Sequence, residues 1–194
     1  MYNKLKEKLE KRSQFIEEDL WQAIKTNSER ITVKKNEVLI PIGSRQKYVY
    51  FIASGSFIAS IVTANGDKRA IWFHFDELFS IVTCPDSYFL NEATKYEVSA
   101  IEDATLLRFQ KEMVDNWVLA YQSFNQFYIN DIIAEFMIMN EIRAIQLSHT
   151  PLQFLSYIRK NYPTIIDSVS SKNLAHFLGV SPEWYSKLKK KESS

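Results

Sequence analysis

The chain has one cysteine and no long hydrophobic run, and each of these shortages excludes a class of protein. Its 194 residues include one cysteine, Cys84, so neither an intramolecular disulfide nor a cysteine-rich zinc or iron–sulfur site can form. No apolar run approaches the roughly 18 residues that a membrane span requires. The N-terminal segment is charged and lacks the apolar core of a secretory signal. We therefore expect a cytoplasmic protein with no membrane partner.

Hydrophobic and charged residues are both plentiful, but the charge is unevenly distributed. Hydrophobic residues make up 46% and aromatic residues 14% of the chain, enough to bury a substantial core. The net charge is only +1, yet residues 143–194 hold eight basic side chains against three acidic ones, a local charge of +5. Such a basic segment is typical of a surface that binds phosphates.

The first domain is expected to span residues 1–109 and to be mainly β-structure. A helix is predicted over residues 3–28, because apolar residues recur there at helical spacing. Short β-branched and aromatic runs follow, separated by turn residues, and about eight such strands close an antiparallel jelly-roll barrel. Asn65-Gly66 predicts a two-residue hairpin turn. The seven runs are residues 30–34, 37–40, 48–52, 56–62, 69–75, 96–101 and 104–109.

Residues 110–147 are predicted to form one long helix that pairs two copies of the chain. Apolar side chains recur three or four apart, and there is no glycine or proline between residues 110 and 148. One stripe can pack on the barrel, but the remainder is too apolar to face water. A helix buried between two domains of one chain is the alternative to a symmetric dimer. The expected dimer residues are Trp117, Tyr121, Phe124, Tyr128, Ile132, Phe136 and Met139.

Residues 148–194 are predicted to form a third domain, a helix-turn-helix. After a helix over residues 151–160, Gly179 supplies the turn between two short helices. Ser181 is the expected N-cap of the second helix, and Pro182 occupies its first position. The side chains expected to face inward are Leu174, Phe177, Leu178, Tyr185 and Leu188. The fold class is thus α+β: a β jelly roll, a long dimerisation helix and a helical DNA-binding domain.

This order of parts resembles the Crp/Fnr family of bacterial transcription regulators, in its short Bacteroidetes-like form. Residues 35–43, 48–55 and 65–66 resemble the glycine-punctuated strands of the family's cyclic-nucleotide-binding-like barrel, and residues 174–188 resemble its DNA-reading unit. The resemblance implies a homodimer on an inverted-repeat operator in double-stranded DNA, with RNA polymerase as a further partner. The residues that it places on DNA are Lys172, Ser181, Glu183, Trp184, Ser186, Lys187, Lys189 and Lys190.

Within that set the expected roles differ. By the resemblance, Glu183 and Lys187 stand where the family reads bases, while Lys172, Lys189 and Lys190 are expected on phosphates. A lysine at 187 lacks the planar fork with which arginine grips guanine, so base preference there is expected to differ. An exposed Trp184 would contact DNA, whereas a buried one would close the core of the small domain.

The effector pocket departs from the family pattern. The resemblance places it at Asp76, Glu77, Leu78, Thr94 and Lys95. Asp76 stands where the cyclic-AMP-binding members have a glycine, and the second segment has no arginine to bind a phosphate. We therefore expect no standard cyclic AMP site, no cofactor and an effector of unknown identity.

Two other functions remain open at this point. One is an effector-sensing or dimerising barrel that does not bind DNA. The other is a cupin-like metalloenzyme, for which His74 and Glu77 are the one candidate ligand pair. The remaining histidines, His149 and His176, lie in the hinge region and in the helix-turn-helix, so a third ligand is missing. We expect no enzyme activity and no metal.

Overall fold

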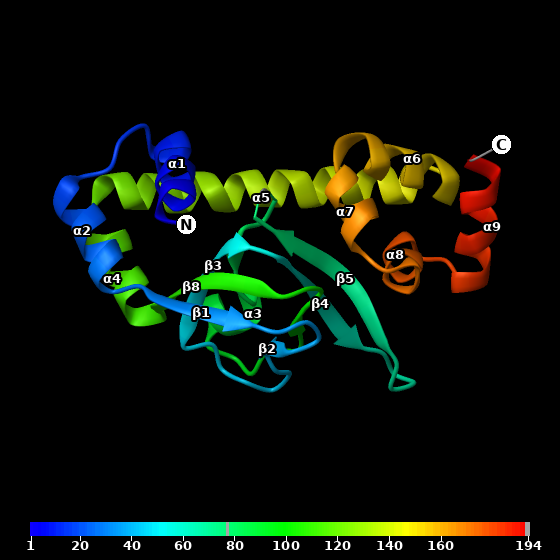
Figure 1. The fold of residues 1–194 in the computed structure, drawn as a ribbon, viewed down its shortest axis with the longest axis horizontal. Helices are drawn as coiled ribbons and strands as arrows, with labels where there is room; N and C mark the ends of the chain where they lie inside the picture. Colours follow the sequence, from blue (N-terminus) through cyan, green and yellow to red (C-terminus); the bar gives the residue numbers. More distant parts are fainter. Residues whose placement is uncertain (77, 193–194) are drawn as a thin grey trace.

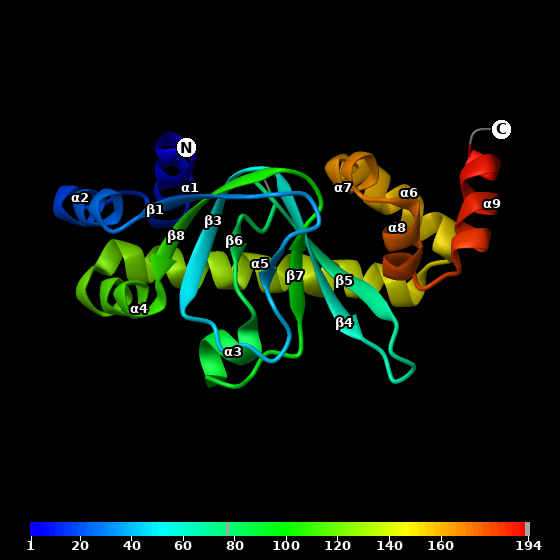
Figure 2. The same cartoon turned by 60° about the horizontal axis from the view of Figure 1, so that its bottom comes forward.

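The structure is a computed structural model that describes residues 1–76 and 78–192. One long helix, α5 (Gln122–Ser148), runs the length of the molecule (Figure 1). The β-sheets lie along its middle, with the N-terminal helices at one end and the C-terminal helices at the other. The second view shows the same arrangement (Figure 2).

Eight strands form two four-stranded antiparallel sheets, ordered β1-β8-β3-β6 and β2-β7-β4-β5. This is the arrangement of a jelly roll, so the predicted fold class is confirmed. Sequence reasoning missed β6, which has only two residues and carries no alternating pattern. The strands are β1 (Glu29–Val33), β2 (Val38–Ile40), β3 (Tyr48–Ser54), β4 (Ser56–Val62), β5 (Lys68–Phe75), β6 (Ile81–Val82), β7 (Glu97–Ala100) and β8 (Ala104–Gln110).

The sheet β1-β8-β3-β6 buries side chains on both of its faces. On β3, Tyr50 and Ile52 face the second sheet and pack in the core between the two sheets. Val49 and Phe51 point the other way and pack against helices. Side chains alternate along a strand, so a strand covered on both faces has an uninterrupted apolar sequence. We call the second side the helix-facing side of this sheet.

The β4–β5 hairpin turns at Asn65-Gly66 as predicted, but its loop is longer than two residues. The Thr63 N–H donates to the Asp67 carbonyl and the Gly66 N–H donates to the Thr63 carbonyl, both at 2.9 Å. Gly66 has φ +85°, whereas Asn65 is not among the residues with positive φ. The predicted two-residue length of the loop is therefore wrong, whereas its position is right. A three-residue loop that ends in a left-handed glycine satisfies the same hydrogen bonds.

The predicted single helix over residues 3–28 is two helices, α1 (Tyr2–Ser13) and α2 (Glu18–Thr26). The chain turns at Gln14, where φ is 71°. The Ser13 hydroxyl donates to the carbonyls of Leu9 and Phe15 and holds this turn. The turn allows α1 to pack across α5 (Figure 1), while buried side chains of α2 and α4 belong to one hydrophobic cluster.

The predicted helix over residues 110–147 is also interrupted, at Tyr121. The two pieces are α4 (Lys111–Ala120) and α5, and Tyr121 between them is extended, with φ −120° and ψ 120°. The Glu17 carboxylate accepts from the N–H and hydroxyl of Ser123 and so caps α5 from α2. The break lets Trp117 and Phe124 pack in one core, with ring centroids 5.7 Å apart.

The described residues after α5 form four helices, and one short helix lies in the connection between β6 and β7. They are α6 (Pro151–Asn161), α7 (Pro163–Ser168), α8 (Ser171–Leu178) and α9 (Pro182–Glu192), with α3 (Pro85–Leu90) between β6 and β7. The helix predicted over residues 151–160 is α6, whereas α3 and α7, with six residues each, were not predicted. Within the described residues no helix has both the length and the apolar character needed to cross a bilayer.

We predict that Gly55→Ala destabilises the protein more than Gly43→Ala does. Both glycines have positive φ, which costs alanine about 1 kcal/mol. A Cβ at Gly55 would also lie 2.6 Å from the Ala104 Cβ, whereas a Cβ at Gly43 would meet nothing within 4 Å. Overpacking should add about 1–3 kcal/mol to the loss at Gly55. Urea unfolding of the two variants tests this, and equal losses would contradict it.

Candidate nucleic-acid interface

Helices α8 and α9 form the predicted helix-turn-helix, and hydrogen bonds define the turn between them. Gly179 follows α8 with φ 72°. Its N–H donates to the His176 carbonyl and the Val180 N–H donates to the Ala175 carbonyl. These two bonds are the Schellman pattern, which ends a helix at a left-handed glycine. The turn predicted at Gly179 is therefore confirmed.

The N-terminus of α9 is capped by Ser181, as the sequence predicts. The Ser181 Oγ accepts from the Trp184 N–H at 3.2 Å, and Pro182 occupies the first helical position. The pKa of the Glu183 carboxyl lies below its ordinary value because its own backbone N–H and the Ser181 hydroxyl hydrogen-bond to it. Glu183 is thus ionised at neutral pH and presents only acceptor oxygens.

The described side chains of α9 divide into a buried face and an exposed face. Tyr185 and Leu188 are 0% and 5% exposed, and they pack with the α8 side chains predicted to face inward. Trp184 is 41% exposed, so it does not close the core of the small domain. The predicted DNA residues on the exposed face are Ser181, Glu183, Trp184, Ser186 and Lys187, and Lys172 is exposed on α8. Lys189 and Lys190 belong to α9, but their side chains lie outside the described part.

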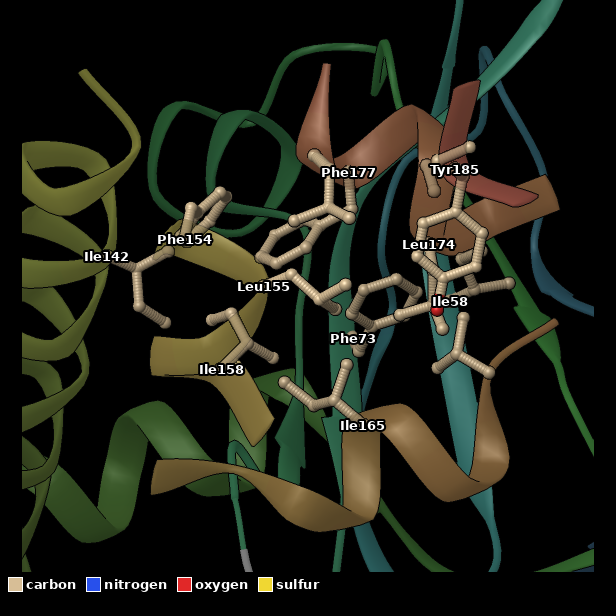
Figure 3. Close-up of a cluster of buried hydrophobic side chains, with 14 of the residues drawn as sticks. Ile58, Phe73, Ile142, Phe154, Leu155, Ile158, Ile165, Leu174, Phe177 and Tyr185 are labelled. Atoms are coloured by element: carbon tan, nitrogen blue, oxygen red, sulfur yellow. The ribbon is translucent and has the colours of Figure 1, made fainter. Parts of the chain in front are cut away.

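Helix α8 packs directly on strand β5 of the jelly roll. Phe177 lies between Phe73 of β5 and Phe154 of α6, with ring centroids 5.2 and 5.7 Å away (Figure 3). The same cluster of buried side chains includes Ile58 of β4 and Ile142 of α5. On α5, the Gln146 side-chain amide donates to the Phe177 carbonyl at 3.1 Å. The helix-turn-helix and the jelly roll therefore share one hydrophobic core.

This packing also brings a charged residue of the jelly roll close to α8. Burial lowers the pKa of His176, and the positive charges of Lys172 and Arg69 lower it further. Arg69 lies on β5, more than a hundred residues before His176 in the sequence. Sequence reasoning missed Arg69 as a neighbour of the interface, because only the tertiary packing of α8 on β5 places it there.

The residues expected to form an effector pocket are divided between two places. Asp76 follows β5 and forms an ion pair of 2.7 Å with Lys4 of α1. Leu78 packs in the core shared with the helix-turn-helix. Thr94 and Lys95 lie after α3, where the Thr94 hydroxyl and the Lys95 N–H both donate to the Asp86 carboxylate. Along the chain β6 and α3 lie between the two segments, and an effector pocket shared by them stays a prediction. Glu77 lies outside the described residues.

The residues expected at a dimer interface also divide into two groups. Trp117 and Phe124 are buried in the core of their own subunit, so neither is available to a second copy. Their assignment to the interface is wrong, because the break at Tyr121 turns both inward. Tyr121 and Tyr128 are half-buried, whereas Ile132, Phe136 and Met139 are exposed. We define the α5 stripe as the exposed apolar side chains Ile129, Ile132, Ile133, Phe136, Met137 and Met139.

Two residues considered for other chemistry are buried in the jelly roll. His74 is hydrogen-bonded through Nδ1 to the Phe79 carbonyl, and burial lowers its pKa to about 4. Cys84 is 1% exposed, and burial raises the pKa of its thiol to about 11. No group of three or more histidine, cysteine, aspartate or glutamate side chains suited to a metal ion is found among the described residues.

Comparison with family models and with curated proteins gives no match. Solved structures do match. A protein described as a transcriptional regulator of the Crp/Fnr family from Eubacterium rectale has a TM-score of 0.70 and 13% identity, over 92% of this chain and 84% of its own. FixK2 from Bradyrhizobium japonicum has a TM-score of 0.67 and 13% identity, over 84% and 83% of the two chains.

The c-di-GMP-responsive regulator CLP from Xanthomonas campestris has a TM-score of 0.67 and 11% identity, over 90% of each chain. Each match extends over most of this chain, so the jelly roll, the long helix and the C-terminal helices are shared together. At these identities the likeness establishes a common fold. The resemblance to the Crp/Fnr family is therefore confirmed for the architecture.

We predict that Ser181→Ala lowers stability by about 1 kcal/mol, since the N-cap hydrogen bond is lost. The pKa of Glu183 should rise toward its ordinary value, because one of its two hydrogen bonds is removed. Ser186→Ala is the matched control, since its hydroxyl donates only to the Pro182 carbonyl within the helix. Urea unfolding and an NMR titration of Glu183 test both effects, and an unchanged Glu183 pKa would contradict the assignment.

Proposed function

We propose that this chain is a DNA-binding transcription regulator of the Crp/Fnr type, acting as a homodimer on an inverted-repeat operator. The observation that carries the proposal is the exposed face of α9. It holds Glu183, Ser186 and Lys187, while Tyr185 and Leu188 fix the opposite face to the core. A helix attached in this way can enter the major groove without unfolding its own domain.

Glu183 and Lys187 are proposed to contact base edges. Glu183 is ionised and sits in the first turn of α9, where a recognition helix approaches bases. Its carboxylate can accept a hydrogen bond from the amino group of cytosine, and Lys187 can donate to guanine. Trp184 is exposed beside them and can contact a sugar or a thymine methyl group.

The lysines around these two residues are proposed to bind phosphates. Lys172 stands at the start of α8, and Lys189 and Lys190 follow Lys187 along α9. Contacts of this kind hold the protein on the duplex and carry no direct sequence information. They release counterions, so binding should weaken as salt rises.

The α5 stripe is proposed to pair two copies of the chain. Phe136 and Met137 are each 65% exposed, and a contiguous apolar surface of this kind is unusual on a monomer. Pairing along α5 gives two-fold symmetry and puts one helix-turn-helix at the same end of each subunit. The operator half-sites should then lie about 34 Å apart. RNA polymerase and a cytoplasmic location are proposed from the family resemblance alone.

The effector is proposed not to be standard cyclic AMP. In the segment after α3, the cation available for a phosphate is Lys95, which is exposed and not an arginine. No cofactor is proposed.

We predict that Glu183→Ala relaxes base preference, whereas Lys172→Ala weakens binding evenly. Loss of the Glu183 contact should reduce discrimination at one base pair by about 1–3 kcal/mol. Lys172→Ala should reduce the salt dependence by about one phosphate contact. Lys35→Ala, an exposed lysine between β1 and β2, is the charge-matched control and should change neither. Titrations of operator DNA and its variants at several salt concentrations test this, and identical effects of the first two changes would contradict it.

We predict that Phe136→Glu raises the dimer dissociation constant by about thirtyfold or more, because it places a carboxylate in an apolar contact. Leu119→Glu is the control, since Leu119 is 86% exposed on α4 and lies outside the α5 stripe. Sedimentation equilibrium measures the dissociation constants of both variants. A dimer of unchanged affinity in Phe136→Glu would place the interface elsewhere. A stable dimer that ignores DNA would favour a sensing module without DNA binding.

A further inference from the structure

An apolar cavity of about 330 Å³ lies on the helix-facing side of the first sheet. Its lining includes Val49 of β3, Phe109 of β8, Leu9 of α1 and Trp117 of α4, together with residues of α5. These strand residues point away from the interior of the jelly roll. The cavity is therefore separate from the space between the sheets and from both segments expected to bind an effector.

Two carboxyl groups of α5, those of Asp131 and Glu135, line this cavity, and one oxygen of Glu135 has no hydrogen-bond partner among the described residues. Asp131 is 6% exposed and pairs with Lys8 at 2.7 Å and Arg12 at 3.6 Å, both on α1. Glu135 lies one turn further along α5. Its Oε1 is buried and has no hydrogen-bond partner among the described residues. A buried carboxyl oxygen without a partner is costly, so the cavity offers an unused acceptor.

The two phenols that line the cavity are already paired. The Tyr88 hydroxyl donates to the Asp115 carboxylate at 3.1 Å, and Tyr88 and Tyr128 hydrogen-bond to each other. Neither phenol is bonded to Glu135. A hydrogen-bond donor on a molecule bound in the cavity would satisfy the Glu135 Oε1 atom.

We propose that this cavity binds a small hydrophobic amine, whose ammonium group donates to Glu135 while its carbon skeleton fills the apolar part. The ionisable groups that line the cavity are acidic or phenolic, since Lys8 and Arg12 are not among the lining residues. The rest of the lining is rich in aromatic rings, whose faces attract cations. The lining aromatic residues are Tyr88, Phe89, Phe109, Trp117, Phe124, Phe127, Tyr128 and Phe136.

The size and position of the cavity suit such a ligand. A volume of about 330 Å³ is at the lower end of the range for small-molecule pockets. Ile132, Phe136 and Met139 of the α5 stripe belong to its lining, so a second copy of the chain would help to enclose it. The proposal goes beyond DNA binding and does not depend on it, because the site is complete in one chain.

Proton release should accompany binding. Burial raises the pKa of Glu135 to about 8, and the Asp131 carboxylate acts in the same direction, while Lys8 and Arg12 oppose both. Below pH 8 the Glu135 carboxyl therefore holds a proton, which must leave before it can pair with an ammonium group. An alkylammonium stays charged throughout this range, so its affinity should rise from pH 6 to pH 8.

The test is calorimetric titration of the full chain, without DNA, with hexylamine, hexanol and hexanoate as probes of one size. We expect hexylamine to bind at least about tenfold more tightly than hexanol, because a charge-assisted hydrogen bond exceeds a neutral one. Glu135→Gln should abolish this preference, whereas Glu112→Gln, an exposed carboxyl on α4, should retain it. Repeating the wild-type titration in two buffers of different ionisation enthalpy should reveal proton release at pH 7.

Several outcomes would overturn the proposal. Equal binding of hexylamine and hexanol would show that Glu135 takes no part, and stronger binding of hexanoate would show that the ligand is an acid. Absence of binding by all three probes would mean that the cavity is filled by the chain itself or by a second copy. The proton-release measurement uses the unmodified protein, so it decides the matter even if Glu135→Gln fails to fold.

Discussion

The packing of Phe177 between Phe73 and Phe154 fixes how α8, and with it α9, sits relative to the rest of the molecule. The Phe177 ring joins three elements, β5, α6 and α8. Rings of this size dominate the energy of a core, and such contacts prefer one of a few geometries. Tyr185 and Leu188 pack α9 against α8, so the packing of Phe177 also determines how the exposed face of α9 is oriented. A change in the jelly roll that displaced β5 would therefore move α9.

Helix α5 contacts the helix-turn-helix, lines the cavity and carries the exposed α5 stripe, each with a different set of residues. Ile142 and Gln146, near its C-terminal end, contact the core and the backbone of the helix-turn-helix. Asp131 and Glu135, near its middle, line the cavity beside α1. The α5 stripe lies on the exposed side. A ligand that altered the contact between α1 and α5 would act on the same helix that the proposed dimer and the helix-turn-helix share.

Local sequence patterns predicted those parts of the fold that nearby residues determine by themselves. The strands from Tyr48 to Phe75 alternate or run apolar in a recognisable way, and Gly179, Ser181 and Pro182 specify a turn whatever surrounds them. The elements that were missed depend on distant partners. The break at Tyr121 contains no glycine or proline, and what holds it is a cap from Glu17, a hundred residues away. The same break explains why Trp117 and Phe124 were misplaced at a dimer surface.

The candidate site could be predicted along α9 but not around it. Exposure of Glu183 and Lys187 follows from helical spacing against Tyr185 and Leu188, whereas Arg69 near His176 follows only from tertiary packing. The buried Glu135 oxygen without a partner could not be foreseen either, since the basic residues near Glu135, Lys8 and Arg12, come from α1.

Two copies of α9 are proposed to read two symmetric half-sites, and the decisive experiment is to map the DNA bound across the genome of the source organism. The bound segments should share an inverted repeat with half-site centres about one helical turn, or roughly 10 base pairs, apart. Bound segments that share only an unpaired motif, or no enrichment of any DNA, would contradict it.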